Sequence, residues 1–147
     1  MKAIVLAGSK GIGKGISEEL KGICKEVVST SSKDLDTSNI DQVKEFVSNQ
    51  KQTDILVLNT GGPPAKDFFK ISEDEWFKYY NQLFYSFVYI LQHLKINDGG
   101  YIFLISSLLG IFFNQFIKLF KQIMTIVRTG TSFGMILNTK YRKIFMF

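Results

Sequence analysis

The chain has 147 residues, of which 46% are hydrophobic and 21% are charged, a balance that fits one globular domain with a real core. Its single cysteine, Cys24, excludes an internal disulfide. We therefore expect a reducing, cytoplasmic setting in which Cys24 is a small buried hydrophobe, and we expect no secretory signal in the strand-like N-terminal run.

The net charge of +5 is unevenly distributed along the chain. Residues 1–107 carry 12 basic and 13 acidic residues, whereas residues 108–147 carry six basic residues and no acid. Seven of the fourteen phenylalanines also fall in residues 108–147. Because the net positive charge comes entirely from this segment, the overall charge gives no support for nucleic-acid binding. We treat residues 1–107 as one domain and residues 108–147 as an atypical basic, Phe-rich tail.

A strand, a glycine-rich turn and a helix open the chain. Residues 3–7 form an apolar run that predicts a short buried strand. Three glycines follow, Gly8, Gly11 and Gly13, and then apolar residues recur at helical spacing. Glycines allow positive φ and close approach of the backbone, and the amino end of a helix attracts anions. This arrangement predicts a phosphate-binding turn of the kind that holds dinucleotides.

The second predicted strand, residues 26–30, is followed by Ser31, Ser32 and Lys33. In a βαβ nucleotide-binding unit this position lies beside the adenosine ribose, where an acid favours NAD and cationic or hydroxyl groups suit a 2′-phosphate. No acid occupies residues 29–33, and Lys10 adds a positive charge in the glycine loop. We therefore expect NADP(H) in preference to NAD(H). The alternative is a solvated serine-rich loop.

The next two predicted elements are a helix over residues 40–50, capped by Thr37 or Ser38, and a strand over residues 54–59. The strand is a continuous apolar run, as in parallel sheets that are buried on both faces. It ends in two glycines and two prolines that forbid its continuation as strand or helix.

A long helix over residues 73–94 is predicted next, with Ser72 as its cap and an acidic first turn. His93, the only histidine, lies near its end without a second histidine or cysteine partner, so we expect no metal site. After a turn over residues 97–100, residues 101–107 predict a further strand that ends in two serines.

Together these segments resemble the short-chain dehydrogenase/reductase family, whose glycine motif usually reads T-G-x-x-x-G-x-G. Ala7 is assigned to the position of its threonine, and the segment from Asn59 is similar to the family's N-N-A-G segment. The resemblance implies an α/β fold: a Rossmann-like doubly wound parallel sheet, here incomplete with about five strands, and helices on both faces.

The resemblance also implies the site. Asp36 matches an aspartate that contacts the adenine ring, and Ser107 matches the active-site serine at the end of its strand. The expected cofactor-binding residues are Gly8, Ser9, Lys10, Gly11, Ile12, Gly13, Ser31, Ser32, Lys33, Asp36, Asn59, Thr60, Gly61 and Gly62.

The chain departs from the family where proton transfer is expected. The family's tyrosine, which donates a proton, begins some thirteen residues after the serine and is followed four residues later by a lysine. Those positions hold Phe120 and Met124, and no tyrosine in the chain has a lysine four residues on. The family's helix asparagine falls in register on Leu83, and Asn81 is offset by about 200° around an α-helix.

The break at residue 108 motivates a hypothesis about the gene. A shifted reading frame in A+T-rich DNA would produce a Phe-, Ile- and Lys-rich segment with an early stop. Translation of the downstream DNA in the other two frames tests it, and the absence of a tyrosine-lysine pair there would contradict it. A membrane role is the competing interpretation, but the uncharged run of residues 101–117 is shorter than a span of about 20 residues requires.

Three functions remain open. The chain is the N-terminal part of an NADP(H)-dependent reductase of a carbonyl or alcohol substrate, a dinucleotide-binding module without catalysis, or the product of a damaged gene. The resemblance favours a 3-oxoacyl substrate, with sugar (glucose-type) dehydrogenase as the alternative. Intact relatives form homo-oligomers.

Overall fold

A computed structural model describes residues 1–105 and 143–146 of the chain. All of its strands are parallel and form one sheet in the order β2-β1-β3-β4-β5. The strands are β1 (Lys2–Val5), β2 (Glu26–Ser29), β3 (Thr53–Leu58), β4 (Ile96–Leu104) and β5 (Lys143–Met146). The helices are α1 (Gly11–Lys21), α2 (Ile40–Asn49), η1 (Phe68–Lys70), α3 (Glu73–Tyr80), η2 (Asn81–Tyr85) and α4 (Ser86–His93).

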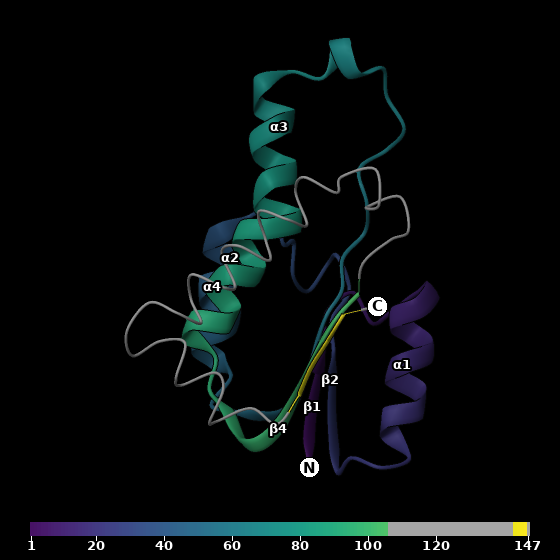
Figure 1. The fold of residues 1–147 in the computed structure, drawn as a ribbon, viewed down its shortest axis with the longest axis vertical. Helices are drawn as coiled ribbons and strands as arrows, with labels where there is room; N and C mark the ends of the chain where they lie inside the picture. Colours follow the sequence, from purple (N-terminus) through teal and green to yellow (C-terminus); the bar gives the residue numbers. More distant parts are fainter. Residues whose placement is uncertain (106–142, 147) are drawn as a thin grey trace.

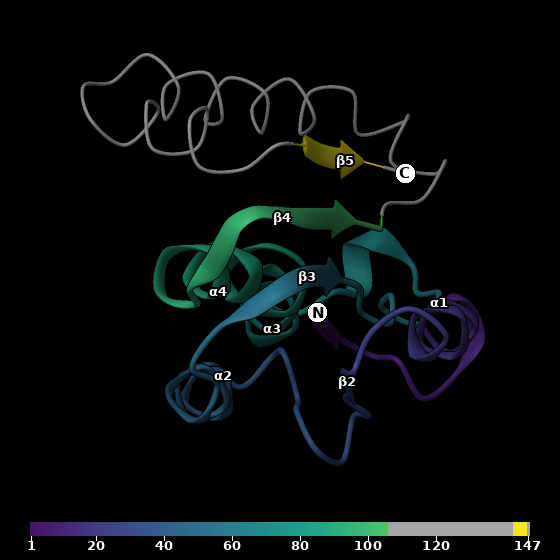
Figure 2. The ribbon, with the colours of Figure 1, turned by 90° about the horizontal axis from the view of Figure 1, so that it is seen from below.

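Helices cover both faces of the sheet. Figures 1 and 2 show α1 on one side of the strands and α2 with α4 on the other. The expected Rossmann-like α/β architecture is therefore confirmed. From β1 the chain first adds β2 on one side, and it later adds β3 on the other side of β1. The order in which strands are added therefore reverses between β1 and β3. Crevices at such switch points are where ligands bind in open α/β sheets.

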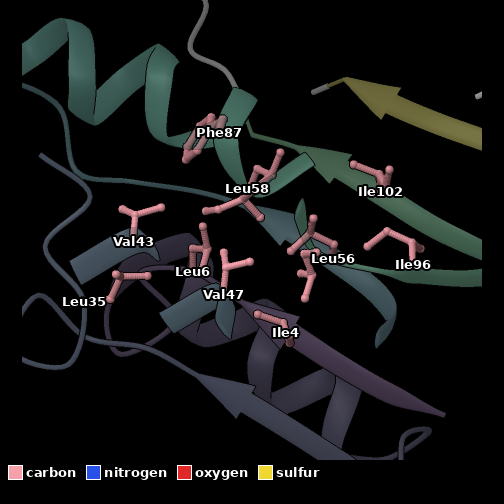
Figure 3. Close-up of a cluster of buried hydrophobic side chains, with 12 residues drawn as sticks. Ile4, Leu6, Leu35, Val43, Val47, Leu56, Leu58, Phe87, Ile96 and Ile102 are labelled. Atoms are coloured by element: carbon pink, nitrogen blue, oxygen red, sulfur yellow. The ribbon is translucent and has the colours of Figure 1, made fainter. Parts of the chain in front are cut away.

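Alternation along the central strands divides the core into two layers. Ile4, Leu56 and Leu58 pack toward α2 and α4, where Val43 and Phe87 close the larger layer (Figure 3). Ala3, Val5, Ile55 and Val57 point to the opposite face, toward Ile16 and Leu20 of α1. Cys24 belongs to this second layer and is buried, as predicted. Burial of both faces explains why β3 reads as an uninterrupted apolar run.

The long helix begins and ends close to the predicted bounds. Ser72 accepts a hydrogen bond from the backbone N–H of Glu75, whose carboxylate accepts one from the N–H of Ser72, so the predicted cap is a complete capping box. In the middle of the helix, η2 is a π-helical segment that joins α3 to α4. The periodicity predicts a regular helix and does not indicate this irregularity.

Two other boundaries differ from the predictions. Asn39 caps α2 by accepting from the backbone N–H groups of Asp41 and Gln42, so the cap is neither Thr37 nor Ser38. Strand β4 begins at Ile96 rather than after residue 100, because residues 97–100 form an irregular stretch where the register with β3 shifts. Gly99 adopts φ +78° in this stretch.

Strand β5 comes from the segment that we treat as an atypical tail. Its backbone pairs in parallel with β4, Tyr101 opposite Lys143 and Leu104 opposite Met146, and it forms the edge of the sheet. The residues of this segment predict no strand.

Candidate dinucleotide site

The loops that follow β1, β2 and β3 meet at the carboxyl edge of the sheet. All three strands run in the same direction, so the loops of residues 6–10, 30–39 and 59–62 gather at one end (Figure 1). The backbone N–H of Ala7 donates to Thr30 Oγ1 at 3.1 Å, and Asn59 Nδ2 donates to the Ala7 carbonyl at 3.3 Å. The first loop is thus tied to both of its neighbours.

The geometry of the first loop corrects the assignment of Ala7. Ala7 has φ +47°, a left-handed conformation that favours glycine. Only two residues separate Gly8 from Gly11, so counting back from Gly11 and Gly13 places Ala7 at the first glycine of the family pattern and Leu6 at the threonine. The assignment of Ala7 to the threonine position was wrong by one residue.

We expect Ala7→Gly to stabilise the fold by about 0.5–1 kcal/mol. The substitution relieves the steric cost of positive φ, which exceeds the entropy that glycine adds to the unfolded chain. Urea denaturation measures the effect. Ala3→Gly, in the buried strand β1, is the control and should destabilise the fold. Equal destabilisation by both substitutions would show that Ala7 is not strained.

Two glycines, Gly8 in the first loop and Gly13 in the first turn of α1, are required by packing. A Cβ on Gly8 would collide with the hydroxyls of Ser17 and Ser29, and one on Gly13 would collide with the Ala7 carbonyl and the Asn59 amide. Ser17 is buried beneath them, and its hydroxyl donates to the Gly13 carbonyl at 2.9 Å while its Oγ lies 3.1 Å from Ser29 Oγ. The amino end of α1 is therefore pressed against the β1 and β3 loops.

Other glycines of the site face open space. A Cβ built on Gly11, Gly61 or Gly62 meets no atom within 4 Å, and Gly11 has φ +52°. Ser9, Lys10 and Ile12 beside them are exposed. Exposed backbone N–H groups at the start of an eleven-residue helix form a cradle that suits a pyrophosphate. The residues present therefore fit a dinucleotide.

The loop after β2 contains an acid next to the predicted phosphate-binding residues. Asp34 accepts hydrogen bonds from the backbone N–H of Ser31 at 2.8 Å and from its hydroxyl at 2.6 Å. The Ser31 hydroxyl is the main cause that lowers the pKa of Asp34 below its usual value. Ser32 and Lys33 are exposed at the same turn.

Asp36 and Thr37 occupy different positions in the turn before α2. Asp36 is exposed and its Oδ1 accepts from the backbone N–H and the hydroxyl of Ser38, at 2.9 and 2.8 Å. Thr37 is buried, and its Oγ1 lies 3.1 Å from Thr60 Oγ1 in the loop after β3. The structure therefore brings the second and third loops into direct contact.

Gln82 reaches the site but is not among the residues predicted from sequence. Its Nε2 donates to the Gly61 carbonyl at 2.7 Å and lies 3.4 Å from Thr60 Oγ1. The neighbouring Leu83, on which the family register falls, is 42% exposed. A polar residue within the aromatic run of the helix was the only sequence signal for Gln82.

Ser107 lies outside the described residues, as do Phe120 and Met124. Within residues 1–105, no group of three or more histidine, cysteine or acidic residues is arranged to hold a metal ion. None of the helices in the described ranges has both the length and the hydropathy needed to cross a bilayer.

No protein-family model matches the chain, and no curated protein matches it. Solved structures do match. One is a small-chain dehydrogenase at 24% identity and TM-score 0.66, with 75% of this chain and 61% of that chain covered. A second is a short chain dehydrogenase from Burkholderia cenocepacia in complex with NADP, at 16% identity and TM-score 0.70, with 95% and 69% covered. A third is BdcA in complex with NADPH, at 14% identity and TM-score 0.74, with 99% and 68% covered.

These likenesses show that the chain has the fold of the short-chain dehydrogenases/reductases. The chain spans 61% to 69% of the length of the three structures.

Proposed function

We propose that residues 1–105 form the dinucleotide-binding part of an oxidoreductase of the short-chain dehydrogenase/reductase type. The observation that carries the proposal is the position of the open glycines at the switch point between β1 and β3. Backbone N–H groups at the start of α1 would hold the pyrophosphate, and Gly61 and Gly62 leave room for the rest of the cofactor. Solved structures of the same fold that contain NADP or NADPH support this reading.

Titration with NADPH tests the proposal. Energy transfer from tyrosines or from Trp76 to the reduced nicotinamide reports binding. We expect saturable binding to the full chain. Absence of binding by both NADPH and NADH, with the protein folded by circular dichroism, would contradict the proposal.

We further propose that NADP(H) is preferred over NAD(H). Asp34 already engages Ser31, so the preference rests on Lys33 and on the exposed hydroxyl of Ser32. A lysine contact to a phosphate is a charge-assisted bond, which is stronger than a neutral one.

We expect Lys33→Glu to weaken NADPH binding about tenfold and to change NADH binding by less than about twofold, since a charged hydrogen bond contributes about 1.5–3 kcal/mol. The two titrations give both values. Lys21→Glu, in the last turn of α1, is the matched control and should affect neither. A parallel loss of both cofactors in Lys33→Glu would remove the basis for the preference.

For the reaction, we propose reduction of a carbonyl group, with a 3-oxoacyl substrate as the best label and a sugar-type substrate as the alternative. The nicotinamide supplies hydride when it is bound. Ser107 would orient the carbonyl, as the resemblance implies. Because the positions of the family's tyrosine and lysine hold Phe120 and Met124, we expect very low turnover. Turnover comparable to that of an intact reductase would refute this assignment of roles.

A module that binds a dinucleotide without catalysis is the second candidate. The packed cradle around Gly8 and Gly13 supports it, because its close contacts come from Val5, Ala7, Ser17, Ser29 and Asn59, all in the described part of the chain. NADPH binding without measurable turnover of any carbonyl substrate is its expected result.

A further inference from the structure

A chain of side-chain contacts joins the long helix to two loops of the candidate site. Gln82 Nε2 donates to the Gly61 carbonyl at 2.7 Å and lies 3.4 Å from Thr60 Oγ1, which in turn lies 3.1 Å from Thr37 Oγ1. The contacts thus connect η2, the loop after β3 and the turn before α2. Gln82 and Thr60 are half-buried, and Thr37 is buried.

The helical end of this chain of contacts is fixed to the core. Ser86, fully buried, donates to the Gln82 carbonyl at 3.2 Å. Phe87 of α4 packs in the layer that faces β1 and β3 (Figure 3). Ile90 of α4 is buried in the same cluster. The π-helical segment alters the helical register between α3 and this anchored part, and such segments frequently occur at functional sites. Gln82 therefore extends from a rigid base.

The loop that receives this contact has little else to hold it. Residues 61–70 are all exposed, and a Cβ on Gly61 or Gly62 would meet no atom within 4 Å. The next two residues, Pro63 and Pro64, have no backbone N–H to donate. Farther along, Lys66 pairs with Glu75 at 2.7 Å. Gln82 thus fixes the start of the exposed run, directly at the candidate site.

We propose that Gln82 is a positioning residue that holds the loop of residues 59–62 in the conformation that accepts the cofactor. This inference rests on the proposed function. Dinucleotides place the adenosine ribose at the end of the second strand and the pyrophosphate at the first helix. The nicotinamide half of the cofactor lies beyond the pyrophosphate, and the loop after β3 would therefore contact that half.

Gln82→Glu and Gln82→Met test the inference. The first keeps the shape of the side chain but replaces the donor with an acceptor facing the Gly61 carbonyl, and the second removes the donor without adding charge. Gln92→Glu, which adds the same charge at an exposed position of α4, is the matched control. Each protein is titrated with NADPH and, by calorimetry, with adenosine 2′,5′-bisphosphate, which lacks the nicotinamide half.

We expect both Gln82 variants to bind NADPH about tenfold more weakly and to bind the bisphosphate like wild type. Gln92→Glu should bind both ligands like wild type. Equal NADPH affinity in Gln82→Met and wild type would overturn the inference and leave the proposed function intact. Equal weakening of both ligands would show a general structural role and would also overturn it. If wild type binds neither ligand, the proposed function fails, and the inference fails with it.

Discussion

Gly13→Ala is expected to weaken NADPH binding by at least about tenfold and to destabilise the fold by about 1–3 kcal/mol, the usual cost of overpacking. A Cβ at this position collides with the Ala7 carbonyl and lies 2.8 Å from Asn59 Nδ2. The Ala7 carbonyl is backbone, so the clash is relieved only if the amino end of α1 moves away from the loops after β1 and β3. That movement displaces the N–H groups proposed to bind the pyrophosphate.

Gly15→Ala provides the matched control two residues along the same helix. A Cβ on Gly15 meets no atom within 4 Å, so alanine is accommodated without a clash. Alanine also favours the helix interior, and we expect stabilisation by about 0.5–1 kcal/mol with NADPH binding unchanged. Urea denaturation and NADPH titration of both variants are the measurements. If Gly13→Ala binds NADPH like Gly15→Ala, the close packing of α1 does not shape the site.

The parts of the fold that depend on local sequence were predictable. The strand, glycine turn and helix at the start of the chain follow from adjacent residues, and so does the capping box from Ser72 to Glu75. The apolar run of β3 indicates burial on both faces, and both faces are covered. In each case the pattern that carries the prediction lies within one short segment.

The features that depend on contacts between distant segments were not predictable. Thr37, Ser38 and Asn39 are all good helix caps, and only the contact of Thr37 with Thr60 explains why Thr37 is engaged elsewhere. Strand β5 exists by pairing with β4, which its own sequence does not indicate. Gln82 reaches Gly61 from a π-helical segment that helical periodicity does not reveal.

The positive φ of Ala7 bears on how the glycine motif of residues 7–13 aligns with the family pattern. The spacing to Gly11 and Gly13 places Ala7, and not Gly8, at the family's first glycine. The positive φ at Ala7 agrees with this assignment, because the chain has a left-handed residue at that position. Gly8 is then required by packing against Ser17 and Ser29 rather than by its backbone conformation.

Asp54 organises the opposite edge of the sheet, away from the candidate site. Its Oδ2 accepts from the backbone N–H of Lys2 at 2.6 Å, and its Oδ1 accepts from Asn97 Nδ2 at 2.7 Å. The bond from Asn97, followed by that from Lys2, lowers the pKa of Asp54. One carboxylate thus joins the beginnings of β1, β3 and β4.

Asp54→Ala is expected to destabilise the fold by about 2–4 kcal/mol, because two hydrogen bonds to a charged group contribute about 1.5–3 kcal/mol each and solvent replaces part of the loss. Asp98→Ala, at an exposed position in β4, is the control and should have little effect. Urea denaturation at neutral pH measures both. Similar destabilisation by the two substitutions would show that the hydrogen bonds of Asp54 contribute no more to stability than the exposed side chain of Asp98 does.

The hydrogen bonds from Lys2 and Asn97 to Asp54 also determine how its contribution to the free energy of unfolding changes with pH. The folded state holds the pKa of Asp54 below its usual value, so it binds fewer protons at this group than the unfolded state does. The stabilisation is therefore fully present above the unfolded pKa of about 3.9 and is lost as the pH falls through the lower folded value. Asp54→Asn removes this contribution, so the difference in unfolding free energy between wild type and Asp54→Asn should shrink as the pH is lowered from 6 toward about 3. A difference that stays constant over this range would show that the carboxylate is not held in its charged form by Lys2 and Asn97.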